Sequence, residues 1–74
     1  MKEEAKIIEL FGKRVRDRRL ELGLSQEELA EKAGLHRTYI GMIERAEKNV
    51  TLINISKLAN ALELSEAEIL TFKK

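Results

Sequence analysis

The side chains best suited to specific recognition chemistry lie between positions 37 and 42, in a short segment with helical periodicity. The guanidinium of Arg37 can donate two hydrogen bonds together, to O6 and N7 of guanine. Thr38 can hydrogen-bond to a base or place its methyl group against thymine. Ile40 and Ile43 lie about one turn apart and should face a core. That orientation turns Arg37, Thr38 and Met42 outward, and it predicts a helix whose exposed first turn contacts base edges.

Two helical patterns separated by a glycine turn would position that segment. Ser25 is followed three residues later by Glu28, a capping box that starts a helix. Gly34 permits the left-handed conformation that ends this helix, and a second pattern begins after His36. Two helices joined by a short turn containing glycine predict a helix-turn-helix over about residues 25–45. In that motif the first residues of the second helix contact base edges in the major groove.

Phosphate contacts should fix the register of such a helix on DNA. The N-terminus of the first helix of the motif is a favourable anion site, and Ser25 and Gln26 lie in it. We therefore expect both residues to contact the DNA backbone, although Gln26 would also suit an ordinary helix surface. A basic cluster over residues 13–19 has two interpretations as well: it binds phosphate, or it forms a solvated helix face.

Three spaced segments carry a resemblance to a known family. They read S-Q-E-E-L-A from Ser25, A-G-L from Ala33, and Y-I-G-M-I-E-R from Tyr39. These segments resemble the helix-turn-helix domain of the phage repressor and Cro-like regulators. The likeness is closer to the controller proteins of restriction–modification systems, through the same stretch and the later N-V-T-L-I-N-I-S-K-L-A-N-A-L. It runs from about Phe11 to Leu64.

The resemblance implies DNA contacts at particular positions of this chain. It assigns base contacts to Arg37, Thr38, Tyr39 and Met42. It assigns phosphate contacts to Gln26, Lys48 and Asn49. For Tyr39 the alternative is a half-buried ring that braces the turn, and for Lys48 it is a solvated loop lysine.

The same resemblance implies a structural ion pair and an altered loop. The family pairs an arginine late in its first helix with the glutamate of I-E-R, which correspond here to Arg19 and Glu44. We expect these two residues to stabilise the fold and not to contact DNA. Ala46 stands where the family usually has glycine, so a left-handed backbone there would cost about 1 kcal/mol. The path of the loop that carries Lys48 and Asn49 therefore stays open.

The pattern of apolar residues predicts five helices and no strand, which indicates an all-α, compact bundle. The resemblance implies a lambda-repressor-like arrangement of these helices. The first helix should run from about Glu4 to Leu22. Thr51 can cap a fourth helix, and a capping box of Ser65 and Glu68 starts a short fifth helix. The core face of the fourth helix should comprise Leu52, Ile55, Leu58, Ala59 and Leu62.

Apolar residues in the C-terminal third predict a homodimer. A single domain this small cannot readily cover all of them, and an exposed apolar patch marks an interface. We expect the dimerisation region to span about residues 52–74. Its interface residues should be Ile53, Ile69, Leu70 and Phe72. The alternative is that these side chains complete the core of the monomer.

Composition narrows the class of protein. The 74 residues suit one domain, 1–74. Because the net charge is only +1, binding to nucleic acid would depend on local groups of basic residues and not on overall charge. The absence of cysteine excludes disulfides and thiolate metal sites, and the apolar runs are too short to span a membrane. His36, the one histidine, suits a turn or N-cap. We see no catalytic constellation, so we expect no enzyme activity, no cofactor, no metal, no small-molecule ligand and a cytoplasmic location.

Together these observations predict a sequence-specific transcriptional regulator that binds double-stranded DNA at a palindromic operator as a homodimer. The resemblance implies a restriction–modification controller protein, with RNA polymerase as a possible second partner. A phage-type repressor or an antitoxin fits nearly as well. A helical protein-interaction module that does not bind DNA is the alternative from another class, and salt-dependent DNA binding would distinguish it.

Overall fold

Five α-helices form the regular structure of residues 2–72, which are the residues that this computed structural model describes. They are α1 (Lys2–Glu21), α2 (Gln26–Ala33), α3 (Arg37–Glu44), α4 (Leu52–Ala61) and α5 (Glu66–Ile69). No strand occurs within this range, so the predicted all-α bundle is confirmed. The predicted short fifth helix is a single turn that ends at Ile69.

Local side-chain chemistry sets the helix ends. Ser25 and Ser65 each accept a hydrogen bond from the backbone three residues on, and Glu28 and Glu68 reach back to complete both predicted capping boxes. Gly34 ends α2 in the left-handed region with a φ of 69°. These contacts satisfy amide and carbonyl groups that a helix end leaves without partners.

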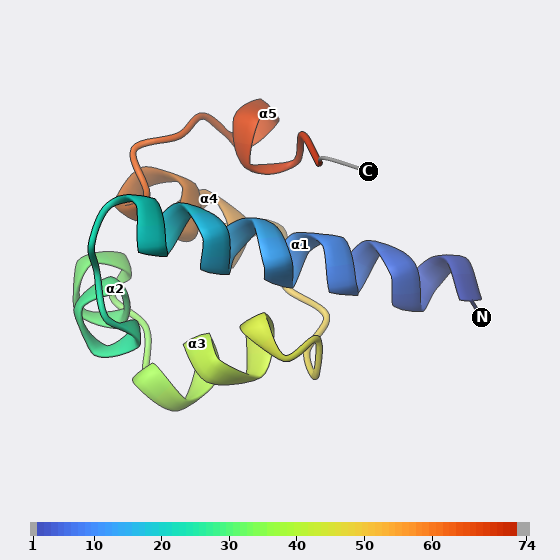
Figure 1. Cartoon of the computed structure of the whole chain (residues 1–74), viewed down its shortest axis with the longest axis horizontal. Coiled ribbons are helices and arrows are strands. Elements are labelled where there is room, and N and C mark those ends of the chain that lie inside the picture. The colour runs from blue at the N-terminus through green and yellow to red at the C-terminus, as the bar shows by residue number, and fades with distance from the viewer. Residues whose placement is uncertain (1, 73–74) are drawn as a thin grey trace.

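The helices enclose one core (Figure 1). Helix α1 runs along the molecule, with α3 on one side of it and α5 on the other. Helix α2 packs against both α3 and α4, and α4 packs against α5. The largest fully buried side chains come from all five helices and the end of α4: Val15, Leu29, Ile40, Ile43, Leu58, Leu62 and Ile69.

Helix α1 approaches the end of α3 unusually closely at Gly12. A Cβ at this position would overlap the carbonyl oxygen of Ile43 and lie 3.2 Å from that of Glu44. Both obstacles are backbone atoms, which cannot rotate away as a side chain can. Glycine therefore sets the distance between α1 and the helix that carries Arg37.

The structure corrects two predictions about apolar side chains. Leu52 was expected in the core but is 82% exposed, because it lies at the start of α4, where the neighbouring Ile53 is also exposed and no other described element covers these two side chains. Ile69 was expected at a dimer interface but is completely buried within the protomer. Helix α5 is a single turn packed on α1 and α4, and Ile69 is its buried residue.

Two arginines of the basic cluster in α1 have a structural role that neither interpretation of the cluster anticipated. Arg18 donates from Nε to the carbonyl oxygen of Leu62 at the end of α4, at 3.0 Å. Arg14 donates from Nε and Nη2 to the carbonyl oxygen of Glu68, at 3.2 and 3.0 Å. A cation at a helix C-terminus also interacts favourably with the helix dipole.

Across residues 2–72 no helix is both long enough and apolar enough to cross a membrane. Within the same range no three His, Cys, Asp or Glu side chains lie together in a way that would hold a metal ion. His36 is used otherwise: its Nδ1 accepts a hydrogen bond from the backbone N–H of Thr38 at 3.1 Å, which caps α3.

Candidate nucleic-acid interface

Helix α3 is anchored on one face and exposed on the other. Ile40 and Ile43 are buried in the core beneath it, as predicted from their spacing. Arg37 and Thr38, in the first turn, are exposed. Met42 is half-buried, so it lies between these two faces. The helix is thus held rigidly while its N-terminal side chains stay accessible to a ligand.

A hollow lies on the surface between the start of α2 and the outer face of α3. Its volume is about 470 Å³, and it opens to solvent. The residues that line it come from both helices and from the residue that ends α3: Gln26, Glu27, Arg37, Thr38, Gly41 and Arg45. The structure therefore brings together three of the predicted DNA contacts, Gln26, Arg37 and Thr38.

Two ion pairs occupy the ends of this hollow. Nη1 of Arg37 lies 3.3 Å from Oε2 of Glu27, and both side chains are largely exposed. Arg45 donates from Nε and Nη2 to the two carboxylate oxygens of Glu47, at 3.0 and 3.2 Å. These hydrogen bonds raise the pKa of Arg45 and lower the pKa of Glu47. Each arginine is therefore held by one carboxylate.

Ser25 and Gln26, the predicted phosphate contacts at the start of α2, both have partners inside the protein. The Ser25 hydroxyl accepts a hydrogen bond from the backbone N–H of Glu28 at 3.0 Å. The Gln26 amide donates from Nε2 to Oε1 of Glu44 at 3.1 Å. Both residues remain at the helix N-terminus that favours an anion. Their contacts with phosphate stay predictions.

Tyr39 braces the bundle. Its ring is half-buried against the core, and its hydroxyl accepts a hydrogen bond from Nδ2 of Asn54 in α4, at 3.1 Å. This is the structural alternative that the sequence left open. The base contact implied for Tyr39 and Met42 by the resemblance stays a prediction.

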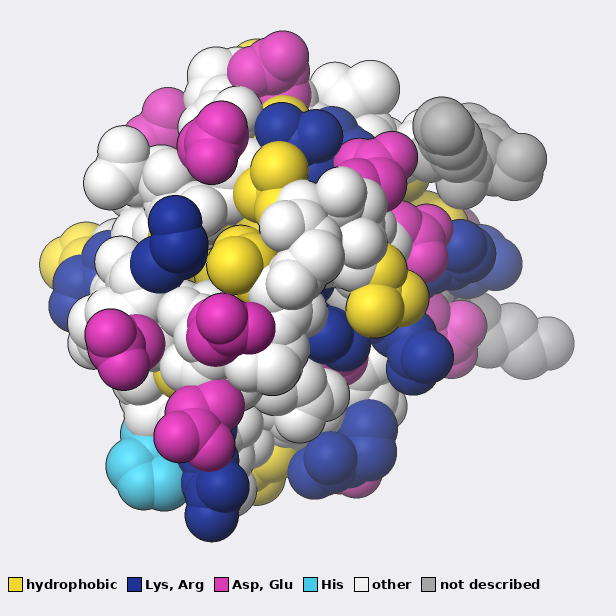
Figure 2. Space-filling model, turned by 60° about the vertical axis from the view of Figure 1, so that its left-hand side comes forward, with side chains coloured by type: hydrophobic (Ala, Val, Ile, Leu, Met, Phe, Trp, Pro, Cys, Tyr) yellow, Lys and Arg dark blue, Asp and Glu magenta, His cyan; other side chains and the backbone are white. Residues whose placement is uncertain are grey.

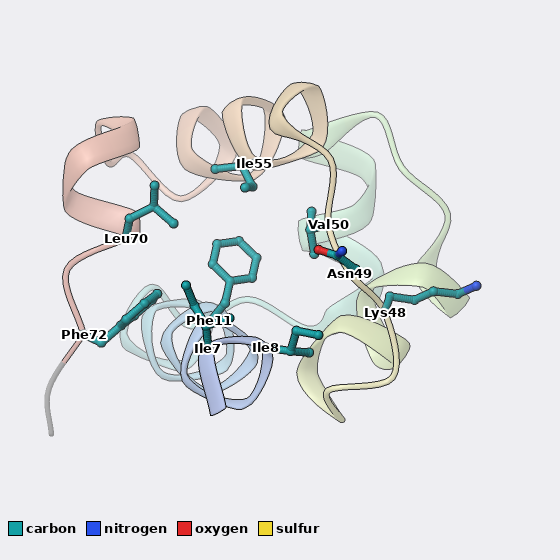
Figure 3. A pocket seen from close by; sticks show the side chains of 9 residues that line it. All are labelled: Ile7, Ile8, Phe11, Lys48, Asn49, Val50, Ile55, Leu70 and Phe72. Atoms are coloured by element: carbon teal, nitrogen blue, oxygen red, sulfur yellow. The ribbon is translucent and has the colours of Figure 1, made fainter. Parts of the chain in front are cut away.

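Lys48 and Asn49 lie away from the hollow, in the loop that follows α3. Ala46 in this loop has a φ of 61°, so the backbone takes the left-handed conformation even without glycine. Both residues are exposed, and they border an apolar cavity of about 110 Å³ between α1, α4 and the C-terminal residues (Figure 3). The Lys48 ammonium points away from that cavity. Any phosphate contact by these residues would therefore occur past the opposite end of α3 from Arg37.

The predicted ion pair of Arg19 and Glu44 is present beneath the motif. Nε and Nη2 of Arg19 donate to the two oxygens of Glu44 at 2.7 and 3.0 Å, and Nη1 donates to the carbonyl oxygen of Leu24 at 2.9 Å. The two side chains are only 10% and 3% exposed. The Glu44 hydrogen bonds raise the pKa of Arg19. Because Gln26 also bonds to Glu44, the pair connects α1, α2 and α3.

A family profile described as helix-turn-helix matches residues 15–69. The chain belongs to this helix-turn-helix family. Control protein C.SmaI of Serratia marcescens is 52% identical over 65 residues, which are 88% of this chain and 77% of that protein. Control protein C.BamHI of Bacillus amyloliquefaciens is 48% identical over 64 residues, 85% of this chain and 79% of that protein. The predicted family and the likeness to controller proteins are confirmed.

Solved structures support the same assignment. The restriction–modification controller protein C.AhdI from Aeromonas hydrophila shares 48% identity with a TM-score of 0.82, over 84% of this chain and 94% of that one. The biofilm regulator SinR, solved in complex with DNA, shares 35% identity with a TM-score of 0.78, over 82% of this chain and 98% of that one. The five-helix arrangement of this helix-turn-helix protein is therefore shared with DNA-bound and controller relatives.

Charge on this helix-turn-helix protein is mixed and not uniformly basic. On the face in Figure 2, acidic and basic side chains alternate over the surface. No role was assigned to Arg45 from the sequence, and the structure places it beside the hollow between α2 and α3. Its spacing held the signal, since Thr38, Gly41 and Arg45 follow one another by three and four residues and therefore share one face of α3.

Proposed function

We propose that this helix-turn-helix protein is a sequence-specific DNA-binding transcriptional regulator that binds an inverted-repeat operator as a homodimer. The exposed first turn of α3 carries the proposal. Arg37 and Thr38 stand there on a helix fixed by buried Ile40 and Ile43. In this motif those positions read base edges in the major groove, and Arg37 has the geometry for guanine. SinR, with 35% identity, binds DNA with the same fold.

The proposed dimer uses the apolar side chains that the protomer leaves uncovered near α4 and α5. Ile53 is 71% exposed and Leu70 is 42% exposed, while Phe72 is half-buried. An interface there would be two-fold symmetric, so each copy would contribute the same patch. It would set the two α3 helices about 34 Å apart, the spacing of successive major grooves on one side of DNA.

The controller relatives support a role in a restriction–modification system. Two of them, C.SmaI and C.BamHI, are about half identical to this chain over most of its length. The protein would act in the cytoplasm by occupying DNA near a promoter, where it would either exclude RNA polymerase or recruit it from an upstream site. Autoregulation of its own operon follows from that resemblance.

Selection of bound duplexes from a random pool tests this function directly. Wild-type protein should enrich an inverted repeat. Arg37→Ala should bind the selected operator about 5- to 150-fold more weakly and lose preference at one base pair in each half-site, because a bidentate arginine contributes about 1–3 kcal/mol of discrimination. Equal loss on operator and random DNA would make Arg37 a phosphate contact. No enrichment at low salt would refute the proposal and favour a protein partner.

A further inference from the structure

Both arginines that border the hollow are held by carboxylates in the free protein. Arg37 is paired with Glu27, and Arg45 is paired with Glu47. We propose that Arg45 is a further DNA contact, to a phosphate, and that DNA must displace Glu27 and Glu47 from the two arginines when it binds. This inference rests on the proposed function, and it makes the two glutamates determinants of DNA affinity.

The position of Arg45 depends on Gly41. A Cβ at Gly41 would lie 3.0 Å from Nη1 of Arg45 and 3.5 Å from Oε1 of Gln26. Without a Cβ there, the Arg45 side chain lies across the outer face of α3 and borders the same hollow as Arg37. The two guanidinium groups therefore stand at opposite ends of one helix face.

The chemistry of the two ends differs. Arg37 is in the first turn of α3, which reaches base edges in this motif. Arg45 is the residue that ends α3, eight positions later. A guanidinium can bind a phosphate through two parallel hydrogen bonds, as Arg45 now binds the Glu47 carboxylate. Phosphate is thus a direct replacement for the ligand that Arg45 already has.

The carboxylates act as internal competitors for the arginines. An arginine that donates to Glu27 or Glu47 must release it before it donates to DNA with the same N–H groups. The released carboxylate would also lie close to a polyanion, which is unfavourable. Since both pairs are solvent-exposed, each should weaken DNA binding by only about two- to fivefold.

Glutamine variants measure this competition. Glu27→Gln and Glu47→Gln should each tighten binding to the selected operator by about two- to fivefold at low salt. Glu31→Gln in α2 is the matched control, because it removes one exposed negative charge and no described contact joins Glu31 to an arginine. If the control tightens binding as much as the two variants, a general charge effect explains the result and the competition is overturned.

Double variants test whether each glutamate acts through its arginine. Glu47→Gln in an Arg45→Ala background, and Glu27→Gln in an Arg37→Ala background, should tighten binding no more than Glu31→Gln does in the same background. Arg45→Ala alone should weaken operator and random DNA by the same factor, and should reduce the slope of log K against log salt by about 0.9. Unchanged binding by Arg45→Ala would overturn its contact. Failure of the wild type to bind any duplex would instead refute the proposed function.

Discussion

Removal of the Glu44 carboxylate should be among the most destabilising single changes in this protein. Arg19 donates two hydrogen bonds to Glu44, and Gln26 donates a third. In Glu44→Ala the Arg19 guanidinium would keep only its bond to the Leu24 carbonyl. It would remain charged, because an arginine side chain stays protonated at neutral pH, and it would remain largely buried, because it is only 10% exposed.

The expected magnitude follows from that burial. Breaking a buried ion pair by removing one partner costs about 3–5 kcal/mol, since the remaining charge has lost its compensation. A domain of this length has a total free energy of unfolding of roughly 4–11 kcal/mol. Glu44→Ala should therefore lose about a quarter or more of the free energy of unfolding. Helix α2 should also lose its side-chain contact between Gln26 and Glu44.

Urea unfolding at neutral pH, followed by far-UV circular dichroism, measures this loss. Asp17→Ala is the control, because it removes a carboxylate from the exposed pair with Lys13 and should change stability by no more than about 0.5 kcal/mol. The double variant Arg19→Met/Glu44→Leu should recover much of the loss, since neither residue then carries a buried charge. A Glu44→Ala loss below about 1 kcal/mol would refute a structural role for the pair.

Three further predictions follow from the packing and the caps. Gly12→Ala should lower the free energy of unfolding by about 1–3 kcal/mol in thermal unfolding, because the added Cβ meets backbone atoms. Gly41→Ala should be neutral or stabilising, because only mobile side-chain atoms lie near its added Cβ. Hydrogen bonds from Ser25 and Ser65 lower the pKa of Glu28 and Glu68 in the folded protein. The stabilisation that these two carboxylates give the fold should therefore be complete above pH about 4.3, and it should disappear as the pH falls through their lowered pKa values. An acid titration of stability that is identical in wild type and Glu28→Gln/Glu68→Gln would contradict this. Ile53→Glu should convert the proposed dimer to a folded monomer in light scattering, and an unfolded variant would show that Ile53 supports the protomer instead.

The helix ends could be predicted from the sequence because the determining contacts are local. Ser25 with Glu28, and Ser65 with Glu68, need only three residues of separation to form a capping box. Gly34 ends α2 through its own backbone conformation. Such features depend on a few neighbouring residues, so the tertiary structure adds little to them.

The sequence could not predict which turns of each helix are buried by another helix. Periodicity shows which side of a helix is apolar, but it does not show which turns on that side pack against another element. Leu52 follows the α4 pattern and is still exposed. Ile69 appeared surplus to the core and is completely buried. The partners of Arg14 and Arg18 were equally invisible, since their carbonyl acceptors lie 54 and 44 residues away in the chain.

The same long-range contacts explain why net charge is a poor guide to the DNA-binding surface here. Three arginines of the basic cluster of α1 have partners within the protein: Arg14 and Arg18 bind helix carbonyls, and Arg19 binds Glu44. Only two arginines line the hollow, Arg37 and Arg45, and each is paired with a glutamate. Formal charge counts all of these groups equally, although only groups that can exchange their present partner for DNA contribute to binding. Affinity should therefore respond to a change at Glu47 more than to an equal change of charge at Glu31.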